Sequence, residues 1–488
     1  MRIEPVCVPD WAGLAWVARF VAGQDALAVY HGPRVEVGTD WLAEAVWCGE
    51  FGPGEFDRTD LVYGSGLRVR PDGVHVVSSA TGVDRLWFSE HEGTWHASNS
   101  LPAMLATSGA SLVDDYDGYS DDLASVEFRG LRHCAREIPA RPRPVQIVYF
   151  DNLFWDGRTL QRRPKPHVER RFEGFGDYEG FLADTARQLG ANLSDPHRAH
   201  PITPLTTISR GYDSAAASAI ARLAGCRQAV TIPNARSLLP RSDDGSEIAA
   251  ALGLACTAVR HRSAAYRREV LMWAVAPHGG GMNLTLFDYP KPLCLLFTAT
   301  YGDKVWDIEY HDLSDPVGDS DMQIGEFRLW EGVFHTVVPW WGIRSAQQVN
   351  AIGGSEQMKP WSIGGAYDRP IPRRILEEAG VPRKLFGRRK LLTASNRAFH
   401  WPFSREARGS FGRFLAARGL YCPPDWLVGL VRWAALAEDL VYLNLLRPVG
   451  LRRRLRPWRR LAGDALRFRW ANEELTRTYR AGLDEVGG

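Results

Sequence analysis

Cysteines and long apolar runs are scarce in this chain. Its 488 residues include seven cysteines, which lie far apart and form no C-x-x-C pair. A disulfide framework or a structural zinc site needs regularly spaced cysteines, so we expect free thiols and a reducing, cytoplasmic compartment. No window approaches the roughly 20 apolar residues that span a bilayer, and the most apolar early run, 13–23, contains Arg19. We therefore expect no membrane partner.

Two common phosphate-binding signatures are also absent. The chain contains neither the P-loop pattern G-x-x-x-x-G-K-[ST] nor a dinucleotide-binding G-x-G-x-x-G after a strand. Its formal net charge is +2, so no strong field over the whole molecule attracts nucleic acid. A bound nucleotide must therefore be held in another way, and we expect no nucleic-acid partner.

The first third of the chain is rich in predicted strands. Short runs of β-forming residues alternate with turn signals such as Pro71-Asp72-Gly73. The predicted strands are 27–30, 66–70, 74–78, 85–89 and 144–150. The composition changes at the charged, proline-bearing stretch 162–171, so we predict two domains, 1–165 and 166–488.

Strand and helix patterns alternate beyond this boundary. Apolar residues recur at helical spacing over 178–189, and a strand is predicted at 202–208 before a tight loop and a helix at 215–224. A second strand at 229–232 precedes a helix at 246–252. This alternation predicts an α/β fold with a parallel, doubly wound sheet. The end of the chain is rich in helix formers, with a helix predicted over 424–446.

The loop between the strand at 202–208 and the next helix has the chemistry of a phosphate site. Backbone N–H groups and the positive end of a helix dipole converge in such a loop. Gly211 would let the backbone approach an anion, and Ser209 and Ser214 would supply hydroxyl donors. Asp213 would hold a magnesium ion against the phosphate oxygens. An ordinary strand-to-helix turn is the alternative.

The sequence Ser209-Arg210-Gly211-Tyr212-Asp213-Ser214 resembles the pyrophosphate-binding loop S-G-G-x-D-S of the N-type ATP pyrophosphatases. This family includes asparagine synthetase, β-lactam synthetase and lasso-peptide cyclases. Arg210 replaces the usual second glycine. The resemblance implies ATP and Mg²⁺ as cofactors and cleavage of ATP to AMP and pyrophosphate. It also places Ile232, at the end of the next predicted strand, in the ATP site.

A second segment, 297–306, resembles the family's S-G-x-G-x-D-E-L-F sequence. The resemblance implies that Asp303 is a second magnesium ligand beside Asp213. Gly302 and Lys304 would then lie at the pyrophosphate. Lys304 replaces the family's glutamate, and its ammonium group could contact pyrophosphate directly.

Tyr301 lies near the position where β-lactam synthetase has a catalytic tyrosine. A general-base role would require a carboxylate such as Glu309 to orient it. Packing of an aromatic ring at a strand end is the alternative.

A third segment, 370–374 with 382–390, resembles the family's P-x-x-[LI]-x-x-R-x-K, and Lys390 matches the lysine that stabilises the adenylate and the departing pyrophosphate. A solvated basic surface is the alternative for Lys390.

The segments 81–88 and 96–101 resemble a strand pair late in the family's glutaminase domain. The resemblance implies an N-terminal domain with the Ntn-type αββα fold. The family's nucleophile is a cysteine exposed by removal of the initiator methionine, whereas this chain begins Met1-Arg2-Ile3 and its first thiol is Cys7. We therefore expect no glutaminase activity.

Together these resemblances imply an ATP-dependent, amide-forming ligase of natural-product biosynthesis, either lasso cyclase-like or β-lactam synthetase-like. It would adenylate a small-molecule or peptide carboxylate, and an amine would capture the acyl-adenylate. Two alternatives stay open. One is an RNA-modifying enzyme with the same loop type, in which the basic run 452–460 contacts RNA. The other is a degenerate, non-catalytic homologue, suggested by Arg210 and Lys304. A homodimer is also left open.

Overall fold

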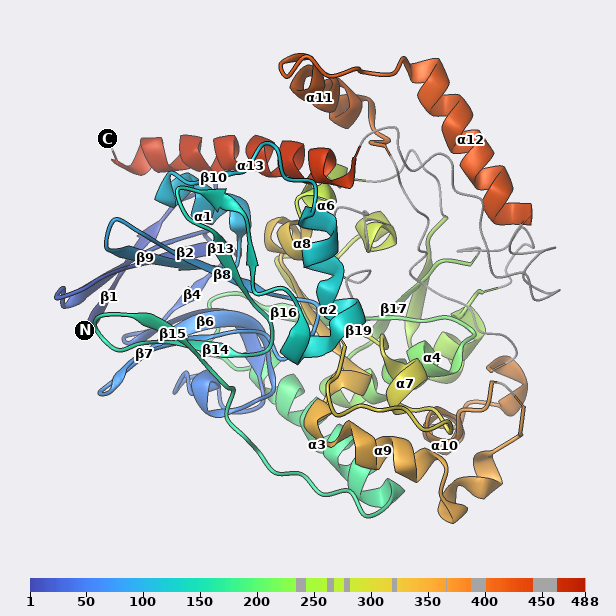
Figure 1. Cartoon of the computed structure of the whole chain (residues 1–488). Helices are drawn as coiled ribbons and strands as arrows, with labels where there is room; N and C mark the ends of the chain where they lie inside the picture. Colours follow the sequence, from blue (N-terminus) through green and yellow to red (C-terminus); the bar gives the residue numbers. More distant parts are fainter. Residues whose placement is uncertain are drawn as a thin grey trace.

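The computed structural model describes residues 1–233, 243–260, 267–275, 281–317, 323–365, 367–387, 401–441 and 463–487 (Figure 1). Three main β-sheets carry the architecture. Two of them are built from the first 163 residues, and the third is a parallel sheet built from residues 202–337. This arrangement confirms the predicted mixed α/β class.

The first sheet has seven strands in the order β1-β3-β2-β9-β8-β13-β11. Their bounds are β1 Arg2–Cys7, β2 Trp16–Val21, β3 Ala26–His31, β8 Leu86–His91, β9 Thr94–Ser98, β11 Glu137–Ile138 and β13 Val145–Val148. The strands β8 and β9 form an antiparallel hairpin in which Trp87 lies opposite Ser98. The strand pair expected in this part of the chain is therefore present. Cys7 lies exposed at the end of β1.

The second sheet has six strands in the order β15-β14-β7-β6-β5-β4. Their bounds are β4 Glu36–Val37, β5 Trp41–Trp47, β6 Val62–Arg70, β7 Gly73–Val77, β14 Asn152–Trp155 and β15 Leu160–Arg163. A two-stranded sheet pairs β10 (Ser111–Leu112) with β12 (Ala140–Arg141). The two larger sheets face each other across a shared apolar core that includes Trp16, Phe20, Leu67 and Trp155.

The third sheet has five parallel strands in the order β18-β17-β16-β19-β20. Their bounds are β16 Ile202–Thr207, β17 Gln228–Thr231, β18 Ala255–Ala258, β19 Leu293–Thr298 and β20 Val333–Val337. The chain builds the sheet outward from β16 on one side and then from β19 on the other. The strands are parallel, as predicted, and their order reverses between β16 and β19, which is where ligands bind in doubly wound folds.

The strands alternate along the chain with helices. Their bounds are α1 Leu101–Ser108, α2 Tyr119–His133, α3 Phe175–Leu193, α4 Tyr212–Ala221, α5 Ser246–Ala251, α6 Glu269–Trp273, α7 Gly302–Val305, α8 Gly325–Glu331, α9 Ala346–Gly353, α10 Pro370–Glu378, α11 Arg405–Ala416, α12 Asp425–Val441 and α13 Asp464–Gly487. Short 3₁₀ helices are η1 Phe56–Arg58, η2 Arg222–Ala224, η4 Met282–Leu286, η6 Val338–Trp340, η7 Ile343–Ser345, η8 Glu356–Trp361 and η9 Arg383–Leu385. No helix in the described residues is long and apolar enough to cross a membrane.

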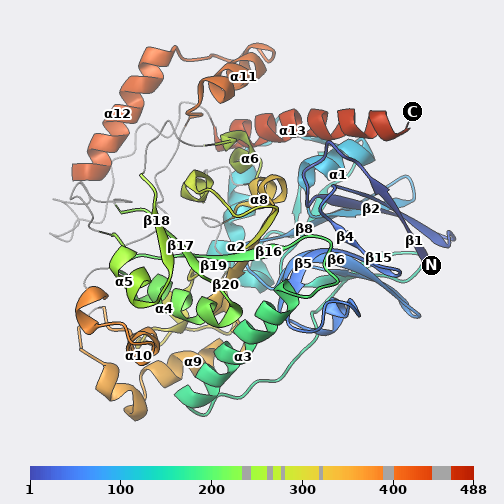
Figure 2. The ribbon, with the colours of Figure 1, turned by 180° about the vertical axis from the view of Figure 1, so that it is seen from behind.

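The last helix returns to the beginning of the chain. Figures 1 and 2 both show α13 lying along α1, on the outer side of the first sheet. The Trp11 indole N–H donates a hydrogen bond of 2.9 Å to the Tyr479 carbonyl, and Phe468 packs against Tyr119 of α2. The last helix of the second half therefore packs against the N-terminal half, although the composition changes at 162–171.

Candidate functional site

The loop that follows β16 is held in a compact turn by its own serines. The Ser214 hydroxyl accepts a hydrogen bond of 3.1 Å from the Ser209 N–H and lies 2.7 Å from the Ser209 hydroxyl. The Gly211 N–H donates to the Ser209 hydroxyl oxygen at 3.2 Å. Gly211 caps α4, so the loop leads directly into a helix N-terminus, where backbone N–H groups lack partners within the helix.

The loops after β16 and β19 contact each other where the strand order reverses. An ideal Cβ atom at Gly302 would lie only 2.8 Å from the Asp213 Cγ, so no larger residue fits there without a shift. Asp303 follows Gly302 in α7, and both Asp213 and Asp303 are partly exposed. The two predicted metal ligands therefore lie in the first turns of α4 and α7, at the same edge of the sheet.

The Tyr212 side chain anchors the first loop instead of facing a ligand. Its ring is fully buried, with its centroid 5.1 Å from that of Tyr367 and 5.8 Å from that of Phe386. The Arg373 guanidinium of α10 donates a hydrogen bond to the Tyr212 hydroxyl. Only the backbone of Tyr212 is therefore placed to contact a phosphate.

Gly387 closes the other side of this anchor. Its N–H donates a hydrogen bond of 3.0 Å to the Arg210 carbonyl, and a Cβ atom there would lie 2.2 Å from the Tyr212 Cζ. Gly387 also has a φ of +72°, which favours glycine. Lys390, the predicted catalytic cation, lies outside the described residues.

The Arg210 side chain is tied to the segment that begins α5. Its Nε donates to the Asp244 carbonyl at 3.1 Å, and its Nη2 lies 2.9 Å from a Glu247 carboxylate oxygen. This pairing balances the charge of the arginine at this position of the loop. We therefore expect Arg210 to contribute to the site through its backbone.

Tyr301 adopts an uncommon backbone conformation at the end of β19. Its φ is +71°, a left-handed value that costs free energy for a residue other than glycine. Its ring packs edge-on against Trp340 at 5.1 Å, and its hydroxyl accepts a hydrogen bond of 3.3 Å from the Val317 N–H. Burial, with further contributions from Asp303 and Asp315, raises the pKa of Tyr301. A protonated hydroxyl at neutral pH suits a hydrogen-bond donor better than a general base.

Glu309 lies in a cluster with Asp307 and His311. It is exposed, and its carboxylate lies within 4.8 Å of the ligand atoms of Asp307 and His311. In the part of the chain that the structure describes, no hydrogen bond joins Glu309 to Tyr301. Glu309 therefore stays an untested prediction as the group that orients Tyr301.

In the Asp307–Glu309–His311 cluster, Asp307 already has a counter-ion in Arg369. Asp307 pairs with the Arg369 guanidinium, and His311 Nε2 lies 3.1 Å from the other Asp307 oxygen. Burial acts to raise the pKa of Asp307, but His311, Arg369 and backbone N–H groups outweigh it and lower the pKa. A metal ion would have to displace Arg369, so we read this cluster as the ion network that shapes the chain after α7.

The remaining predicted residues line the same region. Lys304 is partly exposed on α7, and its carbonyl accepts a hydrogen bond of 3.1 Å from the Asn350 side chain. Ile232 is buried directly after β17. The Ile208 N–H donates to the Val230 carbonyl at 2.9 Å, which joins β16 and β17 immediately before their loops.

Tyr367 is a site residue that the sequence motifs did not reveal. Burial and the neighbouring Asp213 carboxylate raise the pKa of Tyr367, while the Tyr212 backbone N–H opposes this shift. The Tyr367 hydroxyl therefore faces the N-terminus of α4, beside the predicted metal ligand. Tyr367 lies just before the 370–374 segment, and that proximity is the only sequence signal for it.

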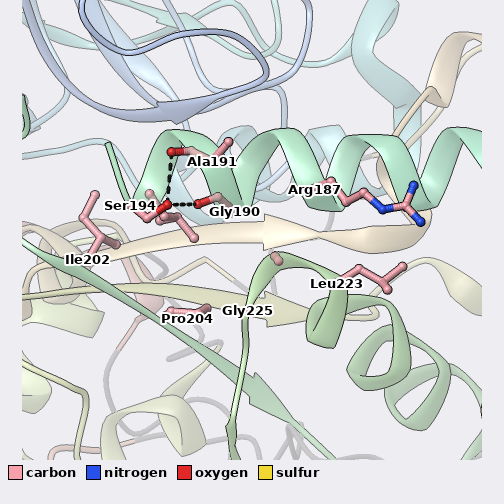
Figure 3. A pocket seen from close by; sticks show the side chains of 10 residues that line it. Arg187, Gly190, Ala191, Ser194, Ile202, Pro204, Leu223 and Gly225 are labelled. Atoms are coloured by element: carbon pink, nitrogen blue, oxygen red, sulfur yellow. Dashed lines mark hydrogen bonds between the residues drawn. The ribbon is translucent and has the colours of Figure 1, made fainter. Parts of the chain in front are cut away.

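The described residues also form a surface pocket far from these loops. It has a volume of about 410 Å³ and lies between the end of α3, the start of β16 and the turn after α4 (Figure 3). Its lining residues include Arg187, Ser194, Ile202, Pro204 and Leu223. Ser194 already donates to the Gly190 and Ala191 carbonyls at 2.8 and 3.3 Å. The pocket lies at the amino end of β16, opposite the candidate site.

Comparison with known proteins adds no assignment. No protein-family model matches the chain, and no curated protein matches it. The candidate site is therefore defined by its residues and geometry alone.

Proposed function

We propose that this protein is an ATP-dependent, AMP-forming carbon–nitrogen ligase. It adenylates a small-molecule or peptide carboxylate, releases pyrophosphate, and lets an amine capture the acyl-adenylate. The observation that carries this proposal is the contact between Asp213 and Gly302, which joins the two predicted nucleotide-binding loops where the strand order reverses. The resemblance of both loops to the asparagine synthetase-like family supports the same reaction.

The residues of the two loops fit a magnesium–nucleotide complex. Mg²⁺ prefers hard oxygen ligands and is commonly bound by one or two carboxylates together with substrate phosphates. Asp213 and Asp303 supply two partly exposed carboxylates in the adjoining first turns of α4 and α7. When bound, the ion would neutralise charge on the pyrophosphate leaving group.

The chain's own groups have separate tasks in this proposal. The N-terminus of α4 and the hydroxyls of Ser209 and Ser214 bind the β- and γ-phosphates. Lys304 and Lys390 offset the negative charge that develops as pyrophosphate leaves. In this proposal the amine is one already present on the substrate or free in solution. Holding acid and amine together supplies much of the rate by proximity.

Nucleotide binding is the first test, because it requires no knowledge of the acid or the amine. We expect calorimetry to show binding of a non-hydrolysable ATP analogue in the presence of Mg²⁺. Asp213→Asn and Asp303→Asn should each weaken this binding by about tenfold or more, because each removes one charged ligand. Asp184→Asn, on the exposed surface of α3, is the matched control and should bind like the wild type.

Product analysis is the second test. With a panel of carboxylate and amine substrates, we expect AMP and pyrophosphate as the products of turnover. ADP and phosphate as the main products would contradict the proposal.

The competing proposal is a degenerate homologue that binds nucleotide without turnover. The arginine at position 210 favours this alternative, because the loop that it resembles has a glycine there. The Arg210 side chain pairs with Glu247. Binding of the analogue without AMP formation from any substrate pair would support this alternative. Co-purified RNA, detected by a high A260/A280 ratio, would instead favour RNA modification by the same loop type.

A further inference from the structure

Helix α12 presents an apolar stripe to solvent. The exposed fractions are 71% for Trp426, 58% for Leu430, 71% for Trp433 and 45% for Val441. Residues three, four, seven and eight positions apart share one face of a helix, so these four side chains form a continuous stripe. Soluble monomers rarely expose large apolar patches without an interaction to explain them.

The residues that the structure describes cover little of this helix. Figures 1 and 2 both show α12 beside α11 at the periphery, away from the three sheets. Among the α12 side chains that the structure describes, only Val428 is buried. The first residue of the helix, Asp425, lies 3.4 Å from the Arg408 Nε of α11. The helix is therefore attached to α11 near Asp425, and the described residues leave its aromatic stripe exposed.

The charge of the following sequence indicates what covers the stripe. Residues 442–462 contain seven arginines and neither aspartate nor glutamate. A dense cationic segment that follows an amphipathic helix in the sequence is typical of proteins that bind anionic lipid headgroups. Tryptophan and leucine on the apolar face suit the boundary between headgroups and acyl chains.

Two other occupants fit these observations less well. RNA would pair with arginines and stack on tryptophan, but it would leave Leu430 and Val441 facing water. A second copy of the chain would cover the stripe, but it would bring two arginine-rich sequences close together. An anionic membrane surface accounts for both the apolar stripe and the charge.

We propose that the exposed face of α12, formed by Trp426, Leu430, Trp433 and Val441, binds the surface of an anionic membrane. The helix lies in the plane of the headgroups, and no helix in the described residues is long and apolar enough to cross the bilayer. This inference is independent of the proposed ligase activity. It differs from the expectation of no membrane partner, which considered only spanning segments.

Vesicle flotation of the full-length protein tests this inference. We expect the protein to float with vesicles that contain phosphatidylglycerol, to stay behind with pure phosphatidylcholine, and to be released by high salt. The variant Trp426→Gln/Trp433→Gln should reduce the bound fraction by about tenfold, because it removes both aromatic anchors. Phe128→Gln is the matched control, because Phe128 is 75% exposed on α2, and it should float like the wild type.

Circular dichroism and thermal unfolding check that the double variant folds like the wild type. Equal flotation of the double variant and the Phe128→Gln control would overturn the proposal, as would an absence of preference for anionic vesicles. Retention of tRNA that the double variant loses, without vesicle binding, would assign the face to RNA. A dimer in light scattering that the double variant converts to monomer would assign it to self-association. Nucleotide binding is measured in parallel, so failure of the ligase proposal remains distinguishable.

Discussion

The contact between Asp213 and Gly302 requires a residue without a side chain at position 302. Glycine is required there because of space, since a Cβ atom would lie within 3.2 Å of three Asp213 atoms. Tyr301, one residue earlier, carries the left-handed backbone turn, although its side chain is large. The two residues therefore share the task that a glycine pair would perform: one provides the turn, and the other provides the space.

We expect Gly302→Ala to weaken binding of the Mg²⁺–nucleotide analogue by about tenfold or more, because the added methyl group displaces the Asp213 carboxylate. Overpacking should also lower the free energy of unfolding by about 1–3 kcal/mol. Gly180→Ala on α3 is the matched control, since nothing lies within 4 Å of its added Cβ, and it should leave binding unchanged. Calorimetry and urea denaturation measure the two effects. Wild-type affinity in Gly302→Ala would show that nucleotide does not use Asp213.

Among the elements, the sequence pattern located those that surround the candidate loops. The predicted strand at 202–208 is β16, the strand at 229–232 is β17, and the helix at 215–224 overlaps α4 and η2. The strand β5 went unpredicted because all seven of its residues are buried, so it lacks the alternation that marks a half-exposed strand. Tyr367 and Arg373 escaped detection because they reach the loop through tertiary packing, which no local spacing records.

The contact between α8 and α13 should make stability depend on pH. Burial raises the pKa of Glu326 from 4.5 to about 7, against opposing hydrogen bonds from Ser100 and Tyr479. The folded state therefore binds this proton more tightly than the unfolded state. The stabilisation is complete below about pH 4.5 and is lost as the pH rises through about 7.

We expect Glu326→Gln to remove this contribution, because glutamine does not titrate. The difference in unfolding free energy between wild type and variant should change by about 3 kcal/mol across the interval, falling for the wild type as the pH rises. Taking this difference cancels groups common to both proteins, including the buried His335, whose pKa is lowered to about 4. Urea denaturation at several pH values measures it. A difference independent of pH would show that the pKa of Glu326 is the same in the folded and the unfolded protein.

At the scale of the whole molecule, a buried ion pair joins the two halves of the chain. Arg328 of α8 lies 2.8 Å from Glu44 of β5, and the two side chains are almost completely buried. Glu44 also accepts hydrogen bonds from Ser65 and Asn99, while Arg328 lies 3.3 Å from Asp84. The pair therefore links the second sheet of the N-terminal half to the helix that precedes β20, and α13 adds a second link on the outer side.

We expect Arg328→Met to lower the free energy of unfolding by about 3–5 kcal/mol, because it leaves the Glu44 and Asp84 carboxylates buried without their cation. Replacing Glu44 by leucine in the same chain should recover part of the loss, since one of the two stranded charges is then removed. Arg187→Met is the matched control, because its ion pair with Asp184 is exposed, and it should change stability by less than about 1 kcal/mol.

Because the Arg328–Glu44 pair crosses between the halves, the wild type should unfold in one transition, whereas Arg328→Met should separate or broaden this transition in calorimetry. A single, undisplaced transition in Arg328→Met would mean that α13 and the apolar cluster that includes Trp11 and Leu205 hold the two halves together without the ion pair.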